Sequence, residues 1–388
     1  MNVSNLSGIS IPNSSPDKTI VTQDIEARLA AIDNAQAKLN QTDTAILESD
    51  MQPASAETLA MIAAQQKQVV VTMVSGNPEQ AIAIALAQSI EAYSARLEAI
   101  DQQTKGLGAF SDAMEIMWKD ISQTSPLTGT ALEDAFQLVL MDVLIHSEDY
   151  PSLTSDDFET IQRFLECSGS GMHGSHEGYD QDEFARDVTS LFNKIYLNAP
   201  EGSLARSIVD SLDADSNCPQ ALVEQFNNGW GNLDGWKYDW ENGVGDVSPI
   251  LRMAILSSLL GDPSIELSSE EYNMILTGSL SDIDGYMQVH FQMNTIGYIN
   301  SDHLQGWNFH WEENESTGTG YGMNFWSSEG VTFDYFEDLA EQLPSRPLTD
   351  EEIEEINRIG DQVKMLQQTL KYWLSICRDE QMAIARNI

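Results

Sequence analysis

Residues 86–121 read LAQSIEAYSARLEAIDQQTKGLGAFSDAMEIMWKDI and carry the strongest periodic signal of the chain. Apolar side chains recur at every seventh position, at Leu86, Tyr93, Ile100, Leu107, Met114 and Ile121. Such a repeat, with further apolar residues four positions on, is typical of a coiled-coil seam. The pattern predicts one helix from Pro78 to Ser122, about 65 Å long at 1.5 Å per residue. A helix of that length needs a partner.

The C-terminal residues 348–388 supply a matching pattern. Thr349-Asp350-Glu351-Glu352 is typical of a helix start, with acidic residues in the first turn. The apolar positions that follow form a second seam, made of Ile356, Ile359, Val363, Leu366, Leu370, Trp373, Cys377 and Ile384. We expect this helix of about 60 Å to pair antiparallel with the first.

The N-terminal part of the chain reads as two segments. Residues 1–20 form a leader rich in Ser and Asn, without the basic and apolar regions of a cleaved signal peptide. Residues 21–75 predict a helical hairpin, because apolar stripes at helical spacing lie on both sides of a break at Pro53.

The rest of the chain differs from these helices in its charge. The 388 residues hold 61 acidic and 19 basic side chains, a net charge of −42. Residues 126–347 carry 38 of the acids and 7 of the bases, and six of the eight tryptophans. Such an acidic surface repels phosphate backbones, so we expect no nucleic-acid partner. No apolar run approaches the roughly 20 residues that span a bilayer.

The fold class predicted is mainly α (α+β). A long antiparallel coiled coil, formed by residues 76–125 and 348–388, would carry the hairpin and an inserted mixed α/β globular domain over 126–347. Within that domain the spacing predicts helices over 132–145, 155–167, 182–196, 202–212, 219–226, 249–260 and 268–276. The turn-dense aromatic stretches 227–245 and 285–331 favour short strands and loops.

Two sets of residues offer weak metal-ligating patterns. Cys167, His173 and His176 have a spacing that zinc accepts, although a Gly/Ser loop with surface histidines is the favoured interpretation. Asp213, Asp215, Asn217 and Glu224 match positions 1, 3, 5 and 12 of a calcium loop that lacks its glycine. An acidic turn before a helix is the favoured interpretation. We therefore predict no metal and no cofactor, and we expect Cys167, Cys218 and Cys377 to be small buried side chains.

The remaining candidates are aromatic. Trp230, Trp236 and Trp240 form one cluster with amides and acids, and Trp307, Trp311 and Trp326 form another. Aromatic faces beside such groups bind sugars or amphipathic steroids, but core packing explains the same residues. No HExxH, P-loop or GxSxG motif occurs, so we predict that the chain is not an enzyme.

The order of these segments, together with the leader and the C-terminal stretch Ile356–Leu374, resembles the needle-tip proteins of type III secretion systems. These are the hydrophilic translocators of the invasion-plasmid-antigen D and V-antigen class. The resemblance implies a secreted virulence protein at the bacterial surface that self-associates on the needle tip. It also implies contact of residues 366–388 with needle subunits, support of hydrophobic translocators, and, in some members, recognition of bile salts. A bile-salt- or glycan-binding module on a helical stalk and a secreted effector enzyme remain alternatives.

Overall fold

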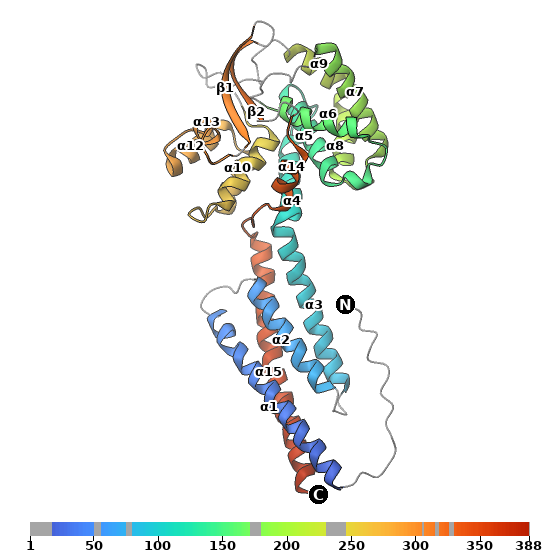
Figure 1. Cartoon of the computed structure of the whole chain (residues 1–388), viewed down its shortest axis with the longest axis vertical. Helices are drawn as coiled ribbons and strands as arrows, with labels where there is room; N and C mark the ends of the chain where they lie inside the picture. The colour runs from blue at the N-terminus through green and yellow to red at the C-terminus, as the bar shows by residue number, and fades with distance from the viewer. Residues whose placement is uncertain are drawn as a thin grey trace. The chain divides into compact units, whose positions relative to one another are not determined.

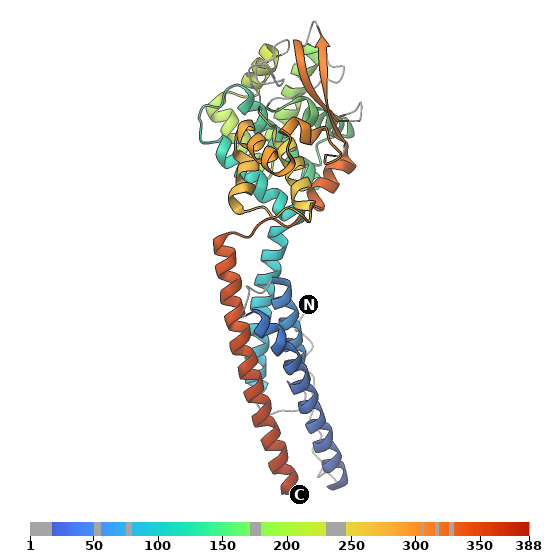
Figure 2. The same cartoon turned by 90° about the vertical axis from the view of Figure 1, so that its left-hand side faces the viewer.

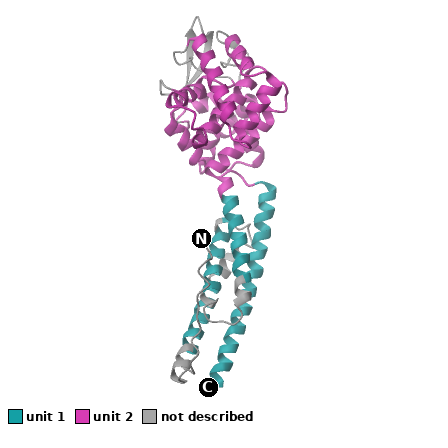
Figure 3. Ribbon diagram, turned by 90° about the vertical axis from the view of Figure 1, so that its right-hand side faces the viewer, with its two compact units in different colours: residues 1–101, 349–388 teal, residues 102–348 magenta. Residues whose placement is uncertain are grey.

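The computed structural model describes residues 18–49, 56–74, 80–170, 180–229, 246–304, 306–314, 318–325 and 330–387 (Figure 1). It confirms a mainly α fold, with 15 helices and two strands in the described part. The chain divides into two units, described separately below: residues 1–101 with 349–388, and residues 102–348 (Figure 3).

The described residues of the first unit form four helices. These are α1 (Lys18–Ser49), α2 (Ala56–Val74), the part of α3 (Gln80–Thr104) up to residue 101, and α15 (Asp350–Arg386). The helix α1 packs on both α2 and α15, and α2 packs on α15 (Figure 2). Their shared core takes one stripe from each helix, including Ile32, Ile62, Ile90 and Val363. The predicted hairpin helices and the C-terminal helix are therefore present, and their apolar stripes are buried.

The prediction of a single helix over 78–122 is wrong. The helix α3 ends at Thr104, and a separate helix, α4 (Gly106–Ile121), begins two residues later. Gly106 has a left-handed φ of +55°, its N–H donates to the carbonyl of Leu343 at 2.9 Å, and an added Cβ would lie 2.8 Å from the Glu341 oxygen. Only glycine enters this conformation without strain.

The expected seam is interrupted as a result. Leu107 is 43 % exposed, and Met114 lies in the core of the second unit, with Ile121 packed against it. In α15 the buried stripe ends at Cys377, because Ile384 is 46 % exposed. Leu107 and Ile384 are therefore not seam positions.

The second unit is built around α5 (Thr130–Ile145), which is buried on all sides. Five helices pack on it: α4, α6 (Ser155–Cys167), α8 (Leu204–Ser216), α9 (Gln220–Gly229) and α10 (Pro249–Gly261). The outer elements are α7 (Gln181–Asn198), α11 (Ser269–Thr277), α12 (Leu280–Phe291), α13 (Thr295–Ile299), α14 (Phe333–Glu341) and a 3₁₀ turn over Ser147–Asp149. The seven helices predicted in this region are confirmed, with ends shifted by at most four residues.

Polar side chains of α5 hold the ends of its neighbours. The Gln137 amide donates to the carbonyls of Leu165 and Ser168 at 3.0 and 2.7 Å and accepts the Ile250 N–H at 3.0 Å. The Asp142 carboxylate accepts the Ala205 N–H at 2.9 Å, in the first turn of α8. Helix ends leave unpaired backbone groups, and these bonds explain why a fully buried helix carries polar residues.

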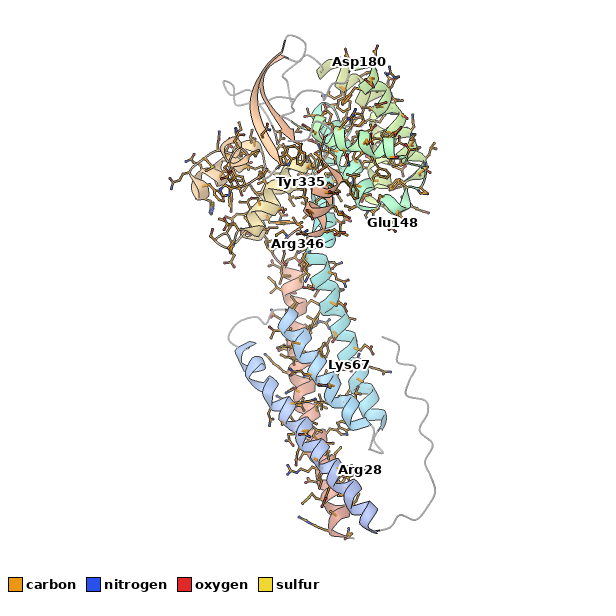
Figure 4. All side chains as sticks on the ribbon, in the orientation of Figure 1. Arg28, Lys67, Glu148, Asp180, Tyr335 and Arg346 are labelled. Carbon is orange, nitrogen blue, oxygen red and sulfur yellow. The ribbon has the colours of Figure 1, made fainter. Side chains whose placement is uncertain are left out.

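The described strands form one antiparallel hairpin of β1 (Trp307–Asn314) and β2 (Gly318–Phe325), with Trp307 opposite Phe325. Both residues at this end of the hairpin are buried, and the Trp307 indole N–H donates to the Tyr335 hydroxyl at 3.0 Å (Figure 4). The prediction of strands is confirmed only for this part of 285–331. Residues 280–299 fold as α12 and α13, because capping side chains at Ser279 and Asn294 start helices there.

Candidate functional site

A buried layer of hydrogen bonds joins all four helices of the first unit. The Tyr93 hydroxyl on α3 donates to Gln66 Oε1 on α2 at 2.5 Å, and Gln66 Nε2 donates to Gln367 Oε1 on α15 at 3.0 Å. Gln367 Nε2 in turn donates to the Leu39 carbonyl of α1 at 2.7 Å. Burial raises the pKa of the Tyr93 hydroxyl well above its ordinary value, so it remains a donor at physiological pH.

This layer fixes how the helices are aligned. A one-residue slide of any helix would leave buried amide groups unpaired, at a cost of roughly 1–3 kcal/mol each. Buried polar residues in helical bundles commonly specify register in this way. The partners of Gln66 lie up to 301 residues away in the sequence, and no local pattern identifies them.

A surface groove of about 830 Å³ runs between α3 and α15. One wall carries the small side chains of Ser89 and Ala92, and the other carries Gln362, Met365 and Thr369. Ile359 and Leu366, both buried, also line it. The groove combines apolar lining with charged side chains.

The charged side chains lie at one end of the groove. Arg358 donates to both carboxylate oxygens of Glu355, at 2.7 and 3.0 Å, and Arg96 approaches the same carboxylate at 3.4 Å. The hydrogen bonds from Arg358, and then the charge and hydrogen bond of Arg96, lower the pKa of Glu355. Two guanidinium groups therefore converge on one carboxylate.

A further ion pair on these helices joins Lys67 of α2 to Glu91 of α3 at 3.3 Å (Figure 4). Both side chains are 44 % exposed, so the pair contributes little to stability.

The face of α15 next to the groove exposes apolar side chains. Met365 is 62 % exposed and Tyr372, two turns further on, is 71 % exposed. Met382 and Ile384 near the C-terminal end of the helix are 40 % and 46 % exposed. Of the C-terminal residues expected to contact a partner, Leu366, Leu370, Trp373 and Cys377 are buried within the unit and Ile384 is available. On α3, Leu86, Tyr93 and Ile100 are buried as well.

The second unit buries a pair of neighbouring carboxylates on α5. Glu133 accepts the Gly169 N–H at 3.2 Å and the Gln225 amide at 3.0 Å. Asp134 accepts the Ser170 N–H at 2.5 Å and the Ser170 hydroxyl. Burial raises the pKa of Asp134 to about 7, against the lowering effect of these bonds. The pair anchors the chain after α6 and was not recognised in the sequence.

The tryptophan clusters are only partly placed. Trp307 is buried in the core, and Trp311 lies in β1, opposite Tyr321 in the register. Trp230, Trp236, Trp240 and Trp326 lie outside the described residues. The binding of a sugar or bile salt by these clusters remains a prediction, and for Trp307 the interpretation as core is confirmed.

The residues that match a calcium-loop spacing, for which an acidic turn was the favoured interpretation, do not form one loop. Asp213 and Asp215 lie within α8, and Glu224 lies within α9. Asn217, with a left-handed φ of +55°, ends α8. These acids therefore point from helices rather than from a turn.

The zinc pattern has only one described member. Cys167 is buried in the core, whereas His173 and His176 lie outside the described residues. In the described ranges no three His, Cys, Asp or Glu side chains are grouped closely enough to hold a metal ion. Cys167, Cys218 and Cys377 are small buried side chains, as expected.

Comparison with known proteins assigns no family. No family model, no curated protein and no solved structure matches the chain. Among the described helices, none combines the length and apolar character needed to cross a membrane.

Proposed function

We propose that the chain is a needle-tip protein of a type III secretion system, which caps the needle and supports assembly of the translocon pore. In this proposal the α3 and α15 seams form a long antiparallel coiled coil and residues 126–347 form the inserted, presented domain. The needle subunit, the hydrophobic translocators and further copies of the chain are its partners, and it acts outside the bacterial cell.

One observation carries the proposal beyond the sequence resemblance. The two ends of the chain fold together in one helical unit, while the continuous stretch 102–348 forms the other. Such a division suits a protein that anchors through its ends and presents its middle. The exposed Met382 and Ile384 then supply a contact at the end of α15.

The test uses the organism that encodes the chain. Deletion of residues 378–388 removes Met382 and Ile384 but keeps the buried stripe up to Cys377. We expect the shortened chain to fold and be secreted, yet to be lost from isolated needles, with pore formation in host membranes abolished.

The matched control is Ile353→Glu, which adds a charge on an exposed part of the same helix outside both the deleted end and the groove. It should leave needle attachment intact. Normal pore formation by the shortened chain, or by a strain lacking the gene, would disprove the needle-tip function.

A further inference from the structure

Backbone groups from a distant part of the chain pair with the break between α3 and α4. In a continuous α-helix each N–H donates to the carbonyl four residues before it, so the Thr104 carbonyl and the Gly106 N–H would bond within the helix. Instead, the Gly106 N–H donates to the Leu343 carbonyl and the Thr104 carbonyl accepts the Arg346 N–H, both at 2.9 Å. Leu343 and Arg346 belong to the strap, defined as the connection at residues 342–348 between α14 and α15. The strap therefore replaces two hydrogen bonds that a continuous helix would make within itself.

The sequence around the break also suits a continuous helix. The apolar heptad positions Ile100, Leu107 and Met114 run through it without a change of spacing. The helix α4 starts without local support, because the side chain of Lys105 does not cap it and its first turn has no acidic residue. Helix starts are normally stabilised by such groups. The position of the break is therefore set by the strap rather than by a start signal at Gly106.

Two glycines permit the broken form. Gly106 has a φ of +55°, and a Cβ added at Gly108 would lie 2.1 Å from the Gln102 carbonyl oxygen. A continuous helix requires neither glycine, because glycine is among the least favourable residues in a helix interior. This segment thus combines the heptad pattern of one helix with the glycines that two separate helices need.

A small number of side chains hold the strap against α4. The Arg346 guanidinium, on a side chain only 8 % exposed, pairs with Asp112 at 2.8 Å, and Leu343 is buried (Figure 4). The strap also borders a surface hollow of about 620 Å³, lined by Leu107 and Pro344 among other residues. Part of the strap therefore faces open space. All of these groups belong to the second unit.

We propose that the strap is a conformational switch: while it is docked, α3 and α4 are separate helices, and its displacement joins them into one helix through residues 102–108. The backbone bonds balance, because the Thr104 carbonyl and the Gly106 N–H then find partners within the helix. The joined form loses the Arg346–Asp112 ion pair and the burial of Leu343, and it gains an unbroken heptad helix. The switch is independent of the needle-tip proposal and goes beyond it.

Hydrogen exchange of the full-length chain, resolved to single amides by mass spectrometry, tests the switch. The amides of residues 107 and 108 lie in the first turn of α4, where helices lack internal acceptors, so they should exchange fast in the unaltered chain. The double change Gly106→Ala with Gly108→Ala disfavours the break and favours a helix. We expect it to slow exchange at residues 107 and 108 at least tenfold, after correction for intrinsic rates. Gly360→Ala, the same change within α15, is the control and should leave these two amides unaffected. Unchanged or faster exchange in the double variant would overturn the proposal.

A change in the strap itself gives a second, independent test. Arg346→Ala removes the ion pair with Asp112, and we expect it to slow exchange at residues 107 and 108 at least twofold. A strap that only supports the fold predicts the opposite sign, because its loss would speed exchange there, and faster or unchanged exchange therefore overturns the switch. Arg206→Ala removes an Arg–Asp pair of the same 2.8 Å length elsewhere in this unit and should leave both amides unchanged. If the double glycine variant fails to fold, the sign of the Arg346→Ala effect decides alone.

Discussion

Asp134 is a residue whose charge depends strongly on folding. Its carboxyl is buried beside Ser170, with the charged groups Asp246 and Arg252 also acting on it. Its pKa of about 7 in the fold compares with an ordinary value of 3.8. Between these values the folded chain binds more protons than the unfolded chain, so the free energy of unfolding falls as pH rises from about 4 to 7.

We therefore expect Asp134→Asn to make the protein more stable at pH 8 and to flatten its pH dependence. Asparagine keeps an acceptor for Ser170 and removes the buried charge. Three pKa units set an upper limit of about 4 kcal/mol on the effect. Urea unfolding at pH 5 and pH 8 measures it. Burial also raises the pKa of Asp142, so part of the pH dependence should persist.

Asp302→Asn, at an exposed loop position, is the matched control and should leave the pH profile unchanged. If Asp134→Asn is less stable than the unaltered chain at pH 8, the carboxylate is ionised in the fold and its bonds to Ser170 outweigh its burial.

Among the elements, α15 depends on its first turn. Thr349 Oγ1 accepts the Glu352 N–H at 3.2 Å, and the Glu352 carboxylate accepts the Thr349 N–H at 2.9 Å. This capping box starts a helix of 37 residues.

Thr349→Ala should lower the free energy of unfolding of the first unit by about 1 kcal/mol. The Glu352 N–H loses its acceptor, and the hydrogen bond from the N–H of residue 349 to the Glu352 carboxylate becomes less ordered. Far-UV circular dichroism during urea unfolding follows the change. Thr369→Ala on the same helix should act in the opposite direction by a few tenths of a kcal/mol, since its hydroxyl bonds back to the Met365 carbonyl and alanine favours helix. Equal effects of the two changes would exclude the capping explanation.

Elements with local signals were predicted well from sequence. The helix over 155–167 was placed at its observed bounds, because Thr154 and Asp157 form a recognisable cap beside an apolar stripe. The break at Gly106 was missed because the heptad pattern continues through it, while the carbonyl that requires the break belongs to Leu343. The groove and the Gln66 layer were missed for the same reason. Both arise only when α3 and α15, distant in sequence, come together.

At the scale of the whole molecule, each unit has its own core. The second unit has a contiguous core made by residues 109–343. The beginning and the end of its chain segment contact each other, because the Arg346 N–H donates to the Thr104 carbonyl at 2.9 Å and the Arg346 guanidinium pairs with Asp112 at 2.8 Å.

The fragment 102–348 should therefore fold alone. We expect the helical content of the intact unit, one cooperative thermal transition and no binding of hydrophobic dye. Arg346→Ala in the fragment should lower its melting temperature, whereas Arg386→Ala in the full chain should not change the melting of this unit. A fragment with exposed apolar surface and no cooperative transition would show that the unit depends on the terminal helices.

The hydrogen bond between Gln66 and Gln367 joins residues 301 positions apart, and this separation sets an order of folding. Contacts of long sequence separation close late, because the intervening chain must first lose its freedom or collapse. The second unit can form from its own residues while the chain is still emerging from the ribosome. The hairpin helices must then wait, without their α15 partner, until the last forty residues arrive. The first unit is thus complete only after α15 (Asp350–Arg386) has been synthesised.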